Sequence, residues 1–211
     1  GPLVLLATVM AVVQVVDTRH ALEAAATELA KAAAQNVDRS TSARLSGLIL
    51  LSHARSLGDP AERERGYALA RDFLDIYGSH IVVANRDSQM LINTRVPLGA
   101  PLPKLPVPRG RSAVAETLAT GKPAVGDLTV GPISGTALIA LSVPIVRDGQ
   151  VRAVVLTAVE QPFFTDRIQV AGTPPAWTVR LLDSVGGVIA LSGPAADGAA
   201  STRAFRAPVS V

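Results

Sequence analysis

Side chains that could carry out acid–base, nucleophilic or metal chemistry are few and scattered in this chain of 211 residues. The three histidines, His20, His53 and His80, lie far apart, and none has another metal-ligating residue type four positions away. The spacing therefore gives neither the helical HExxH zinc site nor a facial triad of ligands. The chain has no cysteine, which excludes thiol catalysis, cysteine–zinc sites and disulfide bonds.

Three further motifs match catalytic patterns only in part. Ser134 lies in Gly-Pro-Ile-Ser-Gly, which lacks the G-x-S-x-G spacing of a nucleophile elbow and is more typical of a turn. Gly121-Lys122 is followed by a proline and lacks the upstream glycine of a phosphate loop. Asp72 and Asp75 are three residues apart on a predicted helix, which indicates a solvated face. We therefore predict no catalysis, no metal ion and no cofactor within this chain.

The composition indicates a folded protein with a substantial core. Hydrophobic residues make up 48% and charged residues 18% of the chain, and the mean hydropathy is +0.35. These values exclude a disordered tail, and the length fits one large domain or two small ones. Aromatic residues are only 3%, the net charge is +3, and no basic run stands out. We therefore expect no nucleic-acid partner, because such proteins need stacking platforms or phosphate-tracking cations.

The beginning of the chain is its most apolar segment. Residues 2–16 contain no charge, and charged residues begin at Asp17. The run is shorter than the roughly 20 residues that cross a bilayer, so we interpret residues 1–16 as the end of a transmembrane helix, possibly truncated. The alternatives are a buried core helix and the apolar part of a signal peptide, although no basic stretch precedes the run.

A single long helix is predicted over residues 17–57. Apolar residues recur there every three to four positions, and the helix should end at Gly58-Asp59-Pro60. About 40 residues at 1.5 Å each form a rod of roughly 60 Å, too long to be buried in one small domain. Its alanine-rich stripe would let a second helix approach closely. We expect this helix to pair with a second protomer in a homodimer; the alternative is packing within one domain along its whole length.

The rest of the chain alternates short helices with β-prone segments. Two runs, His80–Asn85 and Met90–Thr94, flank a polar turn and predict a hairpin. A proline-rich stretch over 95–111 is long for a connection, and such loops are often functional. A second hairpin is indicated by Arg147-Asp148-Gly149. The other predicted elements are a helix over 62–77 that ends at Gly78, a helix over 112–120 capped by Ser112 and Gly121, and strands over 124–130, 136–146 and 150–159. The fold class is α+β, with an antiparallel sheet of about five strands.

Several motifs resemble the extracytoplasmic double-Cache sensor family, as found in bacterial membrane-bound sensor histidine kinases. They are INTRVPLGAPLP at 92–103, ATGKPAVGDLTVGPISG at 119–135, SVPIVRDGQVRAVVLTAVE at 142–160 and VRLLDSVGGVIALSG at 179–193. The resemblance implies a long signalling helix followed by a PAS-like sheet. It assigns residues 58–160 to a membrane-distal module with a ligand pocket. Residues 161–211 would form a second, minimal or incomplete, PAS-like module.

The resemblance places the pocket between the sheet and the loop and helix that follow the first hairpin. Asn93 and Arg95 leave the hairpin toward that loop, and Asp127 lies on the next predicted strand, where it could pair with a ligand amine or with Arg95. Ser142 and Thr157 interrupt apolar strands and need polar partners if buried. Arg95 is the first choice for an anionic ligand. The alternative is that Asp127 caps a turn, Arg95 is solvated and the two hydroxyls bond to nearby backbone.

The resulting hypothesis is a ligand-sensing input domain in the periplasm, part of a transmembrane receptor of the bacterial inner membrane such as a sensor histidine kinase. Its partners would be a small-molecule ligand, the membrane and a second copy of itself. One alternative is a structural module that only dimerises a membrane protein. Another is a periplasmic hydrolase, which would need an exposed nucleophile beside His80.

Overall fold

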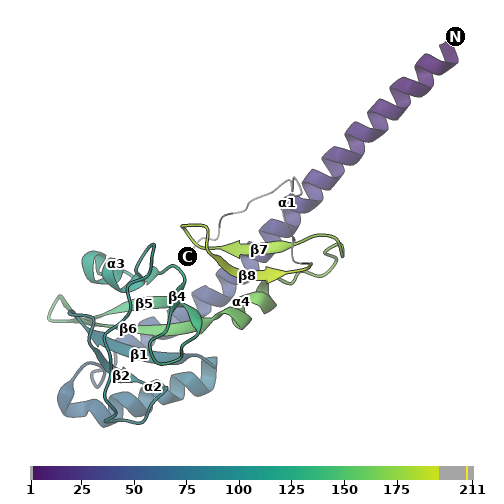
Figure 1. The fold of residues 1–211 in the computed structure, drawn as a ribbon. Coiled ribbons are helices and arrows are strands. Elements are labelled where there is room, and N and C mark those ends of the chain that lie inside the picture. Colours follow the sequence, from purple (N-terminus) through teal and green to yellow (C-terminus); the bar gives the residue numbers. More distant parts are fainter. Residues whose placement is uncertain (1, 195–207, 209–211) are drawn as a thin grey trace.

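A helix of 51 residues, α1 (Pro2–Ser52), projects from a globular α+β body (Figure 1). The computed structural model describes the backbone of residues 2–194 and of residue 208, with side chains from residue 20 onward. At 1.5 Å per residue α1 is about 75 Å long. The predicted rod is confirmed, but its predicted end at residue 57 is wrong. After Ser52 the chain turns. There the guanidinium of Arg147 donates hydrogen bonds to the carbonyls of Ser52, Ala54 and Leu57, in place of the backbone N–H groups that a continuing helix would supply.

Within the part of the chain whose side chains are described, no helix is long and apolar enough to cross a membrane. The apolar run over residues 2–16, which we interpreted as the end of a membrane anchor, lies on α1 ahead of those described side chains.

The core of the body is an antiparallel sheet with the order β2-β1-β6-β5-β3, in which β4 also pairs with β5. The strands are β1 (His80–Asn85), β2 (Met90–Asn93), β3 (Ala124–Val125), β4 (Thr129–Val130), β5 (Ala137–Arg147) and β6 (Gln150–Glu160). The sheet has six strands because the predicted strand over 124–130 is divided in two. Between β3 and β4 the backbone leaves the ladder: the N–H of Asp127 bonds to Arg111 O at 2.9 Å.

Both predicted hairpins are confirmed. β1 and β2 are joined by a turn in which the side-chain oxygen of Asn85 accepts hydrogen bonds from the N–H groups of Asp87 and Gln89. β5 and β6 are joined by Asp148 and Gly149, whose φ values of 53° and 72° both lie in the left-handed region. Two such residues form the turn whose twist matches the twist of the flanking strands.

Helices and loops cover both faces of the sheet. On one face, α1 and α2 (Arg63–Tyr77) pack against Ile81, Leu141 and Val155. On the other, α3 (Ala113–Thr120) and the proline-rich loop pack against a smaller apolar cluster. The predicted ends of these helices are confirmed: α2 ends at Gly78, and α3 lies between Ser112 and Gly121. A short 3-10 helix, η1 (Pro60–Glu62), precedes α2.

The last described part of the chain is one helix and one hairpin. These are α4 (Gln161–Ile168), β7 (Val179–Leu182) and β8 (Val188–Ser192). The hairpin packs on α4, and α4 packs on α1 (Figure 1). The second module expected over 161–211 stays a prediction, since only its first part lies within the described residues.

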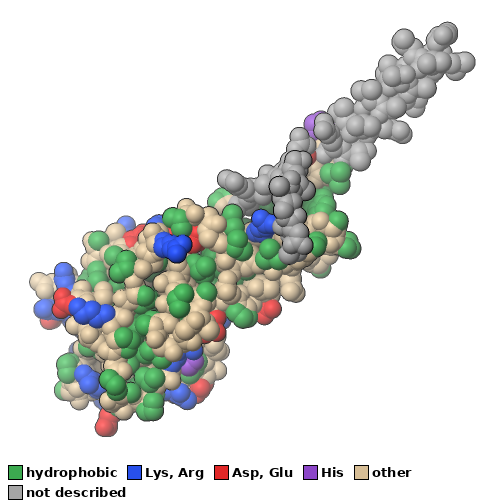
Figure 2. Space-filling view, viewed as in Figure 1, with side chains coloured by type: hydrophobic (Ala, Val, Ile, Leu, Met, Phe, Trp, Pro, Cys, Tyr) green, Lys and Arg blue, Asp and Glu red, His purple; other side chains and the backbone are tan. Residues whose placement is uncertain are grey.

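The face of the molecule drawn in Figure 2 carries interspersed acidic and basic side chains, apart from the residues shown in grey. This face therefore lacks the basic stripe by which a protein follows a phosphate backbone.

One close approach sets the position of α2. A Cβ added to Gly66 would lie 2.5 Å from the carbonyl oxygen of Ser56, which is backbone and cannot rotate away. Helix propensity alone would make Gly66→Ala stabilising by about 1 kcal/mol. We expect Gly66→Ala instead to lower the free energy of unfolding in a urea titration, because α2 must move away from the turn that follows α1. The control is Ala68→Gly at an exposed position of α2, which should cost about 1 kcal/mol. A Gly66→Ala protein as stable as the wild type would contradict the close contact.

Candidate functional site

A small cavity lies on the sheet face that α3 and the proline-rich loop cover. We call it the inner cavity; its volume is about 60 Å³. Its floor is formed by sheet residues including Val82, Leu138 and Leu156, and its roof by residues 105–114 and 126–134. The lining contains no aromatic side chain. The charged residues that line it are Arg95 and Asp127.

The structure brings three of the five predicted site residues to this cavity: Asn93, Arg95 and Asp127. Ser142 pairs with Leu156 across β5 and β6 and so points to the same face. It does not line the cavity, and its fully buried hydroxyl has no hydrogen-bond partner among the described residues. Thr157 does not line the cavity: it pairs with Ile81 and Leu141, which point to the α1 side. Its hydroxyl donates to His80 O at 3.0 Å, as in the alternative in which the hydroxyls bond to backbone.

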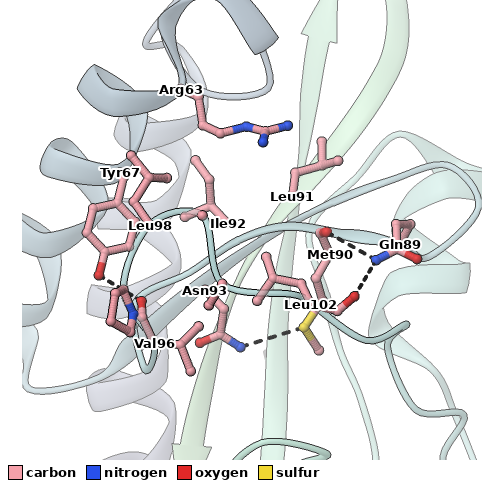
Figure 3. Close-up of a pocket in the computed structure, with 13 residues that line it drawn as sticks. Arg63, Tyr67, Gln89, Met90, Leu91, Ile92, Asn93, Val96, Leu98 and Leu102 are labelled. Carbon is pink, nitrogen blue, oxygen red and sulfur yellow. Dashed lines mark hydrogen bonds between the residues drawn. The ribbon is translucent and has the colours of Figure 1, made fainter.

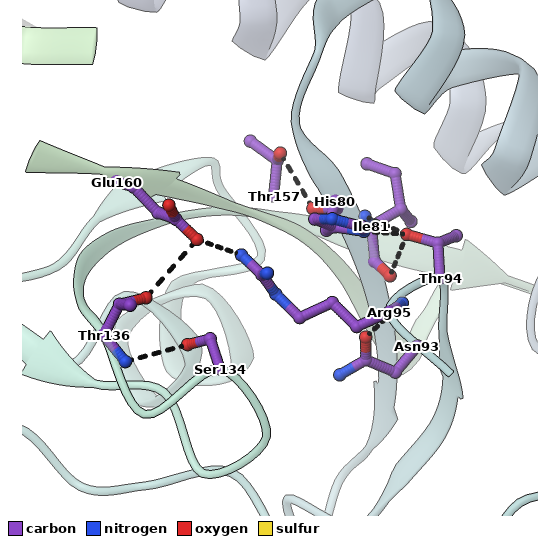
Figure 4. Close-up of polar contacts among 9 residues, drawn as sticks. All are labelled: His80, Ile81, Asn93, Thr94, Arg95, Ser134, Thr136, Thr157 and Glu160. Atoms are coloured by element: carbon purple, nitrogen blue, oxygen red, sulfur yellow. Dashed lines mark hydrogen bonds and ion pairs between the residues drawn. The ribbon is translucent and has the colours of Figure 1, made fainter. Parts of the chain in front are cut away.

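Arg95 forms an ion pair at the edge of the inner cavity (Figure 4). Its guanidinium contacts a carboxylate oxygen of Glu160, and its backbone N–H donates to the side-chain oxygen of Asn93 at 3.0 Å. The Arg95 side chain is only 20% exposed. Glu160 also accepts a hydrogen bond from the hydroxyl of Thr136 at 3.3 Å. Arg95 is therefore neither solvated nor paired with Asp127, and its partner comes from the end of β6.

Asp127 is 2% exposed and is held entirely by neighbouring donors. One oxygen accepts from the N–H of Ser184 at 2.9 Å, and the other accepts from the Ser184 hydroxyl and from the N–H of Arg111 at 2.5 Å. Burial by itself would raise the pKa of Asp127, but the hydrogen bonds from Ser184 and Arg111 outweigh it and lower the pKa. A Cβ on Gly110 would lie 1.9 Å from this carboxylate, so only glycine lets the loop approach.

These hydrogen bonds attach the cavity roof to the β7–β8 hairpin. The turn of that hairpin supplies Ser184 to Asp127, and its Asp183 in return accepts from the N–H of Leu128 at 3.3 Å. The side chain of Asp127 thus connects two parts of the chain that are more than fifty residues apart. This is a structural role, which differs from the predicted pairing with Arg95.

His80 lies on the same face as the ion pair, because it pairs with Ala158 across β1 and β6. Its Nδ1 is 3.1 Å from the hydroxyl of Thr94 (Figure 4). Burial lowers the pKa of His80, the positive charges of Arg95 and Arg71 lower it further, and Glu160 partly offsets them. The Thr94 hydroxyl also accepts from Ile81 N at 3.0 Å, and Thr94 is buried, so it is not the exposed nucleophile that the hydrolase alternative needs.

The ion pair is connected to α1 through α4. Glu160 is the N-cap residue of α4, yet its side chain makes no capping hydrogen bond. In α4, the ring of Phe163 lies between two guanidinium groups, those of Arg44 on α1 at 3.8 Å and Arg167 at 3.9 Å. Asn36 of α1 donates to Arg167 O at 3.4 Å. The cavity edge and the long helix are therefore linked through one short helix.

The size and chemistry of the inner cavity limit what it can hold. Ligand pockets for small molecules are usually about 300–1,000 Å³, so the inner cavity has to widen before it can take a ligand. Within the described residues, no group of three or more histidine and carboxylate side chains could hold a metal ion. What the cavity offers is an apolar space with one cation whose counter-ion comes from the protein.

Sequence reasoning missed Glu160 and Ser184. Glu160 carries a weak signal, since it is an acidic residue directly after the apolar run VVLTAV. Ser184 has no such signal, because only the docking of the β7–β8 turn brings it to Asp127.

The fold is similar to that of ligand-binding domains of bacterial chemoreceptors. The domain of Tlp3 from Campylobacter jejuni, in complex with L-valine, has a TM-score of 0.63 and 16% sequence identity, covering 83% of this chain and 73% of that chain. The domain of CtaA from Pseudomonas fluorescens, with L-serine, has a TM-score of 0.62 and 14% identity, covering 82% and 73%. The domain of PctC from Pseudomonas aeruginosa, with GABA, has a TM-score of 0.60 and 18% identity, covering 82% and 76%. No protein-family model and no curated protein matches the chain.

These neighbours have a Cache-type fold, and the predicted α+β fold with a long N-terminal helix and a PAS-like sheet is confirmed. These neighbours are ligand-binding domains of chemoreceptors, and at 14–18% identity the similarity shows the shared fold.

Removing the Asp127 carboxylate should detach the β7–β8 hairpin. Asp127→Ala leaves the buried N–H groups of Arg111 and Ser184 without an acceptor, which should cost about 2–3 kcal/mol in a urea titration at pH 7. Asp75→Ala, at an exposed position of α2, is the control and should change stability by less than about 0.5 kcal/mol.

Because the folded pKa of Asp127 lies below 3.8, the contribution of its carboxylate to the free energy of unfolding is present above that pH and is lost as the pH falls. The two proteins should therefore converge in acid; a constant difference would contradict this.

His80 should make the fold less stable in mild acid. Its folded pKa lies below the unfolded value of 6.5, so between the two values the unfolded chain binds more protons and stability falls as the pH falls. We expect the melting temperature to drop less between pH 7.5 and 5.5 in His80→Gln than in the wild type. The control for the substitution is His53→Gln, at an exposed position, measured over the same pH range. Identical profiles for wild type and His80→Gln would show that His80 is not buried in this way.

Proposed function

We propose that the chain is the extracytoplasmic input domain of a bacterial transmembrane receptor, that a small anionic molecule binds in the inner cavity, and that the signal leaves through α1. The observation that carries this proposal is the Arg95–Glu160 ion pair at the edge of a cavity between sheet and loop. The rival function is a module that only dimerises a membrane protein.

The ligand chemistry follows from the one cation in the lining. Arg95 offers a planar guanidinium that can bind a carboxylate with two hydrogen bonds. In the structure, the carboxylate of Glu160 already pairs with one nitrogen of this guanidinium. An anionic ligand would replace Glu160 on Arg95 and would widen the cavity by moving the proline-rich loop. Support comes from the solved domains of similar fold, whose ligands L-valine, L-serine and GABA all carry a carboxylate.

Release of Glu160 supplies the signal. Glu160 is in the N-cap position of α4, where a free carboxylate is stabilised by the unpaired N–H groups of the first turn. A shift of α4 would act on α1 through Phe163, which Arg44 and Arg167 enclose. The ligand thus favours one of two arrangements of α4 and α1, and its effect is limited to the difference in its affinity for them.

The receptor that we propose is a homodimer in the inner membrane with this domain in the periplasm. Leu22 and Leu50 on α1 are 53% and 76% exposed, which supports a second copy packing along this helix. For the output we propose a histidine kinase, since the sequence motifs resemble that class. The alternative is a chemoreceptor signalling domain, which the similar solved domains favour.

A thermal-shift screen tests the proposal. The chain is screened with L-amino acids, GABA and short organic acids, with the matching amines as charge controls. At 100 times its dissociation constant, a binder adds about 2.7 kcal/mol, which is a shift of a few degrees for a domain of this size. We expect the shift to be lost in Arg95→Ala and kept in Arg109→Ala, an exposed arginine of the same loop. Glu160→Gln should strengthen binding, because it frees Arg95.

Two results would count against the sensor. No shift from any carboxylate in either the wild type or Glu160→Gln would favour the dimerisation module. A shift kept in Arg95→Ala would move the binding site away from the inner cavity.

A further inference from the structure

A second, larger cavity lies at the outer edge of the sheet, beyond β2 (Figure 3). We call it the outer cavity; it has a volume of about 280 Å³ and lies between α2, β2 and residues 96–102. This is close to the lower end of the roughly 300–1,000 Å³ range of small-molecule pockets. We infer that the outer cavity is a separate binding site for a small aliphatic carboxylate.

The apolar part of this ligand is defined by the walls. Leu91 and Ile92 contribute from β2, and Leu98 and Leu102 contribute from the loop. Leu98 is 37% exposed, so apolar surface is available at the rim. An aliphatic chain that fills the cavity would remove this surface from water, which gains about 25 cal/mol per Å².

The polar groups in the walls are already used by the protein. The Tyr67 hydroxyl donates to Val96 O at 2.8 Å, and the side-chain amide of Gln89 donates to Leu102 O at 2.7 Å. The Asn93 amide donates to the Met90 sulfur at 3.6 Å, while its oxygen accepts from Arg95 N. A ligand with many polar groups would therefore find few partners here.

Arg63 is the exception. It is the first residue of α2 and the one charged side chain among the residues that line the outer cavity. Figure 3 shows it extending from α2 toward β2. The Arg63 side chain makes no hydrogen bond or ion pair with any described residue. By contrast, the guanidinium of Arg65, two residues further along the same helix, pairs with the carboxylate of Glu62 at 3.3 Å. An apolar chain with one negative end matches an apolar cavity with one unpaired cation.

The walls are held in place without a ligand. The backbone N–H of Met90 donates to Pro103 O at 3.4 Å, and that of Leu105 donates to Ser88 O at 2.8 Å. Prolines 97, 101 and 103 restrict the backbone of the loop. In a preformed site, binding orders few protein groups, so little of the binding free energy is lost to conformational entropy.

The outer cavity is distinct from the inner one but shares a wall with it. Met90 and Asn93 line both cavities. Arg63 belongs only to the outer cavity, and Arg95 only to the inner one. The inference therefore does not depend on the proposed function, and the two arginines allow the two sites to be tested separately.

The test is a titration of hexanoate into the wild-type chain, followed by the methyl NMR signals of leucine and isoleucine. We expect saturable shifts centred on Ile92, Leu98 and Leu102 rather than on Leu138 and Leu156 of the inner cavity. Arg63→Ala should weaken binding about tenfold, since it removes one charge-assisted contact. Arg65→Ala is the matched control on the same helix and should bind as the wild type does.

Charge reversal makes the test stricter. Arg63→Glu should lose hexanoate and gain hexan-1-amine, whereas hexan-1-ol should bind both proteins equally weakly. The inference is overturned if hexanoate does not bind, if Arg63→Ala binds it unchanged, or if its shifts centre on Leu138 and Leu156 and vanish in Arg95→Ala. The last result would still support the proposed function.

Discussion

The central constraint in this protein is that β5 and β6 are buried on both faces. These two strands of 11 residues form the middle of the sheet, and most of their side chains are inaccessible to water. Antiparallel sheets often leave one face in water, so this one needs two covers. Helices α1 and α2 cover one face with a large apolar cluster. The other cover is a short helix and a proline-rich loop over a smaller cluster, and this looser packing leaves the inner cavity.

The charged side chains that line the inner cavity are satisfied by the protein itself. Arg95 has Glu160, and Asp127 has Ser184 and Arg111. Buried charges need such partners, because an isolated charge in an apolar space is costly. The two pairs differ in what they connect. Asp127 attaches the cavity roof to the β7–β8 turn, whereas Arg95 attaches the cavity edge to Glu160, the N-cap residue of α4. The contacts that satisfy these charges thus also connect the site to the rest of the molecule.

α4 is the element through which those connections meet. It follows β6 directly, contacts the β7–β8 hairpin and lies against α1. The Arg44–Phe163–Arg167 arrangement fixes it there, because guanidinium groups are attracted to both faces of the ring. A helix of eight residues with one end at the cavity and one side on α1 is well placed to transfer a small displacement.

The sequence by itself determined most of the elements up to β6, whereas α4, β7 and β8 were not predicted. Spacing of apolar residues predicted α1, α2 and the strands of the large sheet. Local turn chemistry predicted the two hairpins of that sheet and the caps at Ser112, Gly78 and Gly121, because these depend on neighbours in the chain. Family motifs placed Asn93, Arg95 and Asp127 near one cavity. Only the tertiary structure decided their partners. Arg95 pairs with Glu160, which is 65 residues away in the sequence, and Asp127 with Ser184, which is 57 residues away. Arg147 bonds to the last carbonyl of α1, more than 90 residues before it. Such contacts depend on strand register and on how the helices dock, which no local pattern records.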